Sequence, residues 1–249
     1  MSGHSKWAQI KRKKSKTDAQ RGKVFTRLIR ELTVAARMGG GDPDSNVRLK
    51  SAITHARASN MPVENIERAI RRGTGELPGV QYEEVQYEGY GQGGVAIIVD
   101  VMTDNRKRTT SDLRHIFTKH GGSLGAPGCV GWMFETRGII EVSKEKADED
   151  TLIGAGLEAG CDDVRPSGNT YELICQPENL ESAKHALSAK GITWEHAEVQ
   201  KYPKNVVKLE SKEAAQVLRL VEELEEHDDV QNVYSNFDIP DEVLEQVSK

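Results

Sequence analysis

The chain has 249 residues, of which 37% are hydrophobic and 29% charged, so it is long enough for one to three domains with ordinary cores. The longest aliphatic run, residues 95–99, is far shorter than the roughly 20 apolar residues of a membrane helix, and no apolar stretch of a secretory signal follows the basic N-terminus. The 3 cysteines are an odd count and include no C-x-x-C pair, which argues against a disulfide scaffold or a zinc knuckle and fits a reducing compartment.

Charge is distributed unevenly along the chain. Residues 1–75 hold 17 of the 34 Lys and Arg residues but only 6 of the 39 Asp and Glu residues. The remainder is strongly acidic and would repel phosphate, so any contact with a polyanion should be regional. This asymmetry predicts a nucleic-acid-binding region near the N-terminus.

Residues 1–17 form a basic arm with no acid before Asp18. Because only Trp7 and Ile10 are large and apolar there, we expect the arm to be mobile and unimportant for thermal stability. Its cations suit the counterion-release binding of a phosphate backbone; they are Lys6, Lys11, Arg12, Lys13, Lys14 and Lys16. Four more cations continue this charge onto the next segment, at Arg21, Lys23, Arg27 and Arg30.

Apolar residues at helical spacing predict three short amphipathic helices after the arm. The first begins at Asp18 and ends at the glycine run 39–41, the second begins near Asp44, and the third runs from Pro62 to near Gly73. A Gly- and Pro-containing linker follows at residues 73–79. We therefore expect a basic helical domain at residues 1–76.

Beyond the linker, strand and helix patterns alternate. A strand is expected at 94–103, a helix at 106–120 and a strand at 129–134; after residue 203 come a strand at 206–209, a helix around 214–224 and a strand at 230–234. Between these halves lies a complete βαββαβ series, at residues 139–142, 147–159, 161–164, 171–175, 177–189 and 192–199. The simplest interpretation is an α+β protein: an N-terminal three-helix domain, then a ferredoxin-like domain (80–136 plus 204–238) into which a second ferredoxin-like domain (137–203) is inserted.

The sequence offers no convincing catalytic, cofactor or metal motif. Residues 89–94 match G-x-G-x-x-G, but they open a strand, so the helix N-terminus that a dinucleotide needs is missing. The seven histidines include no H-E-x-x-H pair, and there is no P-loop. The six acids within residues 222–229 indicate a solvated helix end, with a protein partner as the alternative. We predict no enzymatic activity and no cofactor.

A second cationic cluster follows the strand at 94–103. Residues 109–112 look like a capping box, which would place Arg106, Lys107 and Arg108 at a helix N-terminus, where the helix dipole disfavours cations. A bound phosphate would reverse that preference, and Arg114 extends the cluster; a solvated loop is the alternative. We expect reversal of Arg106 and Arg108 to Glu to weaken binding without lowering the melting temperature.

Six blocks of the sequence form an ordered set along the chain: Gly3-His4-Ser5-Lys6-Trp7-Ala8-Gln9-Ile10 and residues 39–43, 60–62, 87–90, 103–106 and 121–125. These blocks resemble the YebC family of bacterial and organellar proteins. The resemblance extends over residues 1–238; Gln92 stands where the family loop has proline, and Cys129 replaces a frequent serine. It implies a cytoplasmic, non-enzymatic, three-domain protein without agreed catalytic residues. Family members are described as DNA-binding transcriptional regulators, and others, including a mitochondrial relative, as ribosome-associated translation factors.

Three functions are compatible with these features. A DNA-binding transcriptional regulator comes first, although the turn at residues 60–62 lacks the glycine of a typical helix-turn-helix. A ribosome-associated translation factor that binds RNA comes second, because phosphate and shape contacts need no base-reading code. Aromatics are only 5% and no RNP motif is present, which argues against sequence-specific recognition of single strands. A ligand-sensing or scaffold module is third, on fold analogy alone.

Overall fold

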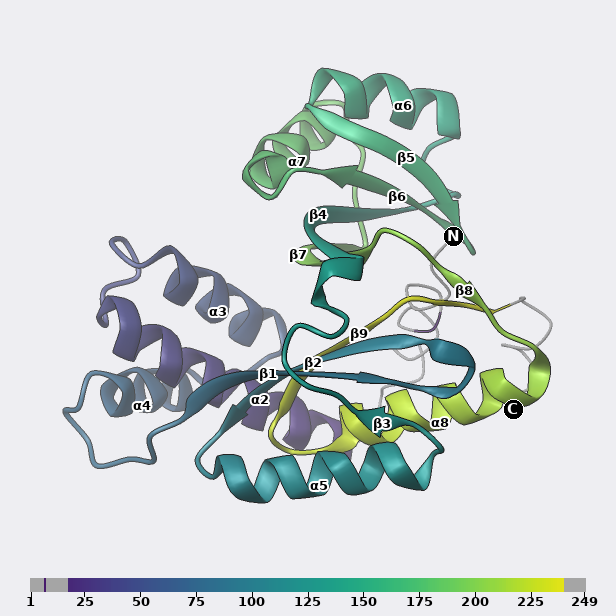
Figure 1. Ribbon diagram of the computed structural model, residues 1–249. Coiled ribbons are helices and arrows are strands. Elements are labelled where there is room, and N and C mark those ends of the chain that lie inside the picture. Colours follow the sequence, from purple (N-terminus) through teal and green to yellow (C-terminus); the bar gives the residue numbers. More distant parts are fainter. Residues whose placement is uncertain (1–6, 8–17, 240–249) are drawn as a thin grey trace.

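The computed structural model describes Trp7 and residues 18–239, with the side chains of residues 18–21 excepted (Figure 1). Its first part is a helical unit of α2 (Asp18–Gly39), α3 (Val47–Ala58) and α4 (Val63–Gly73). These helices share a core that includes Leu32, Leu49 and Ile66, so the three predicted helices are confirmed. The second of them begins later than expected, because Asn46 and not Asp44 is its N-cap: Asn46 Oδ1 accepts the Leu49 N–H at 3.0 Å.

The first sheet has the strand order β3-β1-β2-β9, with every pair antiparallel. Its strands are β1 (Glu83–Tyr90), β2 (Ala96–Thr103), β3 (Ser123–Leu124) and β9 (Val230–Ser235). Helices α5 (Arg106–Lys119) and α8 (Ser211–Glu226) cover one face and bury a core with Ile97, Val99 and Phe117 (Figure 1). Residues 89–94 form the hairpin between β1 and β2, with the short helix η1 (Gln92–Gly94) at its tip.

The second sheet has the order β5-β6-β4-β7, again fully antiparallel. Along the chain its elements are β4 (Phe134–Ser143), α6 (Glu149–Glu158), β5 (Cys161–Ser167), β6 (Thr170–Cys175), η3 (Pro177–Asn179), α7 (Leu180–Ala189) and β7 (His196–Pro203). This confirms the predicted βαββαβ series and, with the first sheet, the α+β fold class. Figure 1 shows α6 and α7 on the outer side of this sheet, opposite the side of the molecule where α5 and α8 lie.

The two sheets match position by position, with one exchange. The strands β3, β1, β2 and β9 occupy the places of β5, β6, β4 and β7, and α5 and α8 the places of α6 and α7. However, the matching strands β1 and β6 enter their sheets at different points of the chain. The strand β1 comes first in its unit and forms a hairpin with β2, whereas β6 comes after β5 and forms a hairpin with that strand. The expectation that two βαβ halves would pair across the insertion is therefore wrong in detail.

Three strand predictions in the first unit are corrected. The strand β1 was not expected, because Glu83, Glu84, Gln86 and Glu88 hide its apolar alternation. Residues 129–134 form no continuous strand but a loop and the short helix η2 (Gly131–Met133). The strand β8 (Val207–Lys208) lies outside the four-stranded sheet and pairs in parallel with β10 (Phe237–Asp238). The residue ranges of the three expected domains remain predictions.

Trp7 contradicts the expectation that the arm has little to bury and contributes little to stability. Its side chain is 6% exposed and belongs to the core cluster of the first sheet, together with Val95, Leu209 and Phe237. An indole is among the largest apolar groups a chain can bury, so it fixes one point of the arm on the first unit. The search of the described residues finds no helix long and apolar enough to cross a membrane.

Candidate nucleic-acid interface

The cationic cluster lies in the first turn of α5, and its cap differs from the predicted one. Asn105 is the N-cap: its Oδ1 accepts the Arg108 N–H at 3.1 Å, and its own N–H donates to Thr103 Oγ1 at 2.9 Å. The capping box expected at residues 109–112 is wrong, because Thr109 is buried inside the helix and its hydroxyl donates to Asp229 at 2.6 Å. The cations thus lie within the helix rather than in front of it.

The four predicted cations of α5 are all exposed, and Arg106, Lys107 and Arg114 differ from Arg108 in their partners. Arg106 and Lys107 lie in the first turn, and Arg114 lies two turns beyond Lys107 on the same side. No acid within the described part of the chain forms an ion pair with them. Two of these three charges stand at the positive end of the helix dipole, which disfavours them by a few tenths of a kcal/mol. This surface would gain from an anion.

Arg108 is partly exposed but pairs with two acids. Its Nη2 donates to Asp104 Oδ1 at 2.9 Å and to Asp229 Oδ2 at 2.8 Å. Asp229 comes directly before β9, and its side chain is only 3% exposed. Arg108 therefore supports the junction between α5 and β9, which the charge pattern alone could not show.

Asp229 joins the helical unit to the first sheet. Its Oδ1 lies 2.8 Å from Arg30 Nη1, and Arg30 also donates to the Met102 carbonyl at 3.0 Å and the Asp228 carbonyl at 2.7 Å. Burial alone would raise the pKa of Asp229, but hydrogen bonds from Thr109 and Arg108 and the charge of Arg30 outweigh it and lower that pKa to about 2. The carboxylate stays ionised because three donors from two helices hold it.

The basic face of α2 is docked against the end of α8. Lys23 donates to the Glu226 carbonyl at 3.3 Å, Arg27 to the Glu225 carbonyl, and Arg30 to Asp228 and Asp229. The last carbonyls of a helix lack intrahelical partners and carry the negative end of its dipole, so they attract cations. The acidic run at residues 222–229 is therefore in part a docking surface for α2, and the expected solvated helix end is wrong to that extent.

The remaining predicted cations cannot be placed. Lys6, Lys11, Arg12, Lys13, Lys14 and Lys16 lie outside the described residues. The backbone of Arg21 lies in α2, and its side chain is also outside the description. The structure thus brings Arg30 and Arg108 together on one carboxylate, engages Lys23 and Arg27 with α8, and leaves Arg106, Lys107 and Arg114 outward.

Sequence reasoning missed further exposed cations on the helical unit. Arg57 of α3 and Arg68 and Arg72 of α4 are exposed, and none has an ion pair within the described ranges. For α4, the helical period could have predicted these cations. Ile66 and Ala69 are buried on one face of the helix, so Arg68 and Arg72, which lie outside that face, are exposed. An exposed tryptophan, Trp132, was also missed.

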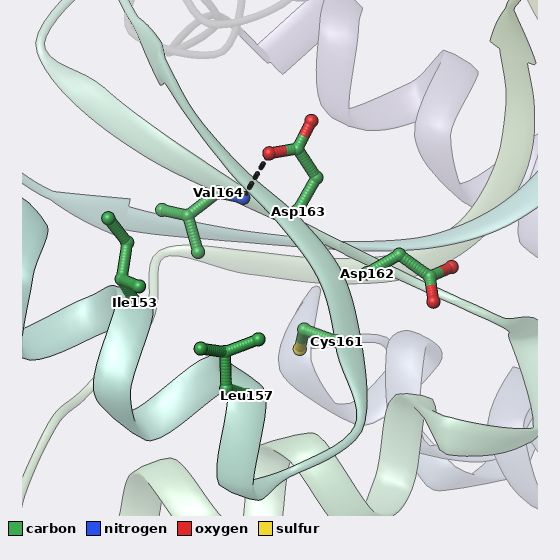
Figure 2. Close-up of a pocket in the computed structure, with 6 residues that line it drawn as sticks. All are labelled: Ile153, Leu157, Cys161, Asp162, Asp163 and Val164. Atoms are coloured by element: carbon green, nitrogen blue, oxygen red, sulfur yellow. Dashed lines mark hydrogen bonds between the residues drawn. The ribbon is translucent and has the colours of Figure 1, made fainter.

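A shallow pocket of about 180 Å³ lies between α6 and β5 (Figure 2). Ile153 and Leu157 of α6 face the strand that carries Cys161 and Val164, while the Asp163 side chain bonds its neighbour's backbone N–H at 2.9 Å. A hydrogen bond with Cys175, together with burial, raises the pKa of Cys161, so its thiol stays protonated and is a poor nucleophile. The described residues also contain no group of three or more metal-binding side chains.

Comparison with known proteins places this arrangement in a family. A model described as "TACO1/YebC protein N-terminal domain" matches residues 5–76, and one described as "TACO1/YebC second and third domain" matches residues 82–237. The chain belongs to the TACO1/YebC family. Two relatives, each named "Probable transcriptional regulatory protein", come from Dictyoglomus thermophilum (57% identity, all of both chains) and Desulforapulum autotrophicum (56% identity, 98% of this chain and 99% of the relative).

A solved structure supports the same assignment. The crystal structure of a conserved hypothetical protein from Aquifex aeolicus is similar to this chain with a TM-score of 0.82 and 49% sequence identity. The match covers 92% of this chain and 95% of that one. The structural similarity therefore extends over nearly the whole chain.

Proposed function

We propose that this TACO1/YebC chain is a non-enzymatic, cytoplasmic regulatory protein that binds nucleic acid, with DNA-binding transcriptional regulation as its first role. One observation carries the proposal: Arg106, Lys107 and Arg114 form an outward cationic face beside the junction where α2 is docked. A phosphate at the start of α5 would meet three positive side chains and the positive end of the helix dipole. The name of the relatives favours transcription.

In this proposal, the basic arm and the α5 face contact one polyanion. Arg30 is held at the same carboxylate as Arg108, and the N-terminal end of α2 lies twelve residues, or about 18 Å, before Arg30 along the helix axis. Duplex DNA carries one charge about every 1.7 Å of its axis, so a short duplex extends across this distance. Two tethered contacts on one ligand raise the effective concentration of the second.

The experiment compares full-length proteins by fluorescence anisotropy with a labelled 20-bp duplex DNA over a range of salt concentrations. Replacing Arg106, Lys107 and Arg114 by Gln should lower affinity at least ten-fold and reduce the slope of log K against log salt by about 3. The matched control replaces Lys144, Lys184 and Lys190 of the second-sheet unit by Gln, with the same change in net charge. If both triple variants had the same affinity and the same salt slope, the proposal that the α5 face binds DNA would be refuted.

An RNA-binding role at the ribosome is the second candidate. Phosphate contacts alone would serve a duplex of either kind, and the exposed Trp132 favours a ligand with unpaired bases. Separation of a lysate on a sucrose gradient distinguishes the two roles. Co-migration with ribosomes that is lost in the α5 triple variant would favour translation, and co-migration with the nucleoid would favour transcription.

A further inference from the structure

Trp132 is the exposed tryptophan of the part of the chain that the structure describes. Its side chain is 63% exposed, whereas Trp7 is 6% exposed and Trp194 packs against the core of the second sheet. It lies in η2, directly before β4, where the chain passes from the first sheet to the second. The other large hydrophobic residues exposed in the described chain are aliphatic, so this ring is chemically distinct on the surface.

The indole is held in place by its polar edge. Trp132 Nε1 donates to the Cys129 carbonyl at 3.1 Å, and the Tyr90 hydroxyl donates to the same carbonyl at 3.0 Å. The face of the ring takes no part in these bonds. Because its only polar group is satisfied from within the loop, the ring can remain oriented while a ligand covers it.

A buried carboxylate fixes the loop under the indole. Glu88 of β1 is 7% exposed, and it accepts the N–H groups of Gly128, Val130 and Gly131 at 2.9, 2.7 and 2.7 Å. Although burial opposes ionisation, these three donors lower the pKa of Glu88, so it remains a charged acceptor near neutral pH. The loop is therefore rigid before any ligand binds.

A cation is bonded to the backbone of the residue that carries the ring. Lys204 Nζ donates to the Trp132 carbonyl at 3.1 Å, and the Lys204 N–H donates to the Met133 carbonyl at 2.9 Å, so both bonds hold Lys204 against η2. An open aromatic face combined with an ammonium group held on the same short segment is the combination that proteins use for unpaired bases and their phosphates.

We propose that Trp132 and Lys204 form a stacking site for one unpaired nucleobase of a single-stranded nucleic acid, with the base on the indole and a flanking phosphate at Lys204. This inference rests on the proposed function and deepens it by naming the form of the ligand. In a duplex both faces of each base are already stacked, so the site selects single strands or loops without reading their sequence. An aliphatic protein partner would gain nothing from the ammonium of Lys204.

The test uses the full-length protein with fluorescein-labelled 12-nucleotide single-stranded RNA, single-stranded DNA of the same sequence, and the matching DNA duplex. Trp132→Ala should bind the single strands about ten-fold more weakly and the duplex unchanged, and Trp132→Phe should retain most of the affinity. Lys204→Gln should reduce the salt slope on single strands by about 1. Intrinsic fluorescence should be quenched by single strands in the wild type and much less in Trp132→Phe.

The outcomes separate this inference from the proposed function. Equal single-strand affinity of wild type and Trp132→Ala would overturn the stacking site while leaving the α5 face intact. Equal losses on single strands and duplex, with a lower melting temperature, would make Trp132 structural and overturn it too. A change in oligomeric state in Trp132→Ala would assign the ring to a second copy and also overturn it. If the wild type bound none of the probes, the proposed function itself would fail. A preference of the wild type for single-stranded RNA or single-stranded DNA would identify which nucleic acid the stacking site takes.

Discussion

The cations of α2 and those of α5 look alike in the sequence, but they have different partners in the structure. Lys23 and Arg27 contact the carbonyls at the end of α8, and Arg30 binds Asp229. Arg106 and Lys107, by contrast, face outward without an acid from the described chain. The difference shows that the basic residues of a helix can be engaged by negative groups of the same chain. The C-terminal carbonyls of another helix then compete with phosphate for these cations. Arg108 belongs with α2 in this comparison, although it is adjacent to Lys107.

The strongest way to break this comparison is to remove the group that the paired cations share. Asp229→Ala leaves Arg30, Arg108 and the Thr109 hydroxyl without their buried acceptor, and we expect a loss of about 4 kcal/mol in the free energy of unfolding. Denaturant unfolding followed by circular dichroism measures it. The control is Asp104→Ala, because Asp104 is 39% exposed and pairs with Arg108 alone; it should cost less than 1 kcal/mol. Similar losses of stability in both variants would contradict the conclusion that Asp229 holds the helical unit and α5 together.

The arm supplies a second comparison, between its apolar anchor and its charge. Trp7→Ala empties a buried site in the core of the first sheet and should destabilise the protein by about 3 kcal/mol. Replacing Lys11, Lys13 and Lys14 by Gln should leave stability within about 0.5 kcal/mol and weaken binding to duplex DNA. Thermal unfolding and anisotropy on the same two variants separate the roles. A Trp7→Ala protein as stable as the wild type would restore the expectation of an arm with little to bury.

How far the sequence could predict the structure depends on the range of the interactions. The three helices of the helical unit and the βαββαβ series follow from local apolar periodicity, and both are confirmed. The strand β1 was missed because acids alternate with its apolar residues, and one of them, Glu88, points into the protein to hold a loop. The partner of Arg108 lies 121 residues away, so no local pattern could tell it from Lys107.

Acid titration sharpens the first comparison further. The pKa of Asp229 is about 2 in the folded protein and near 3.9 in an unfolded chain. Since the folded value is the lower one, the stabilisation is fully present above about pH 4 and is lost as the pH falls towards 2. The difference in unfolding free energy between wild type and Asp229→Asn should therefore shrink by about 2 kcal/mol over that window. A difference that stays constant from pH 5 to 2 would show that the carboxylate charge contributes nothing there.

The smallest expected change in stability comes from Arg106 and Arg108, two arginines of the first turn of α5. The sign of the change distinguishes the arginine that has an internal partner from the one that does not. Arg108→Gln should cost about 1 kcal/mol, since it removes a charged donor from Asp229 and Asp104, and its own side chain is 46% exposed. Arg106→Gln should instead raise stability by a few tenths of a kcal/mol, because it removes from the positive end of the helix dipole a cation that no acid of the described residues pairs with. Because Arg108 pairs with Asp104 and Asp229, the Arg108 part of the double reversal to Glu is now expected to lower the melting temperature, while the expectation for Arg106 stays a prediction. Parallel melting curves of the two single variants at low salt measure both signs, and binding to duplex DNA should fall in Arg106→Gln even as its stability rises. Two losses of equal size would mean that Arg106 also has an internal partner, and the outward face of α5 would then be reduced to Lys107 and Arg114.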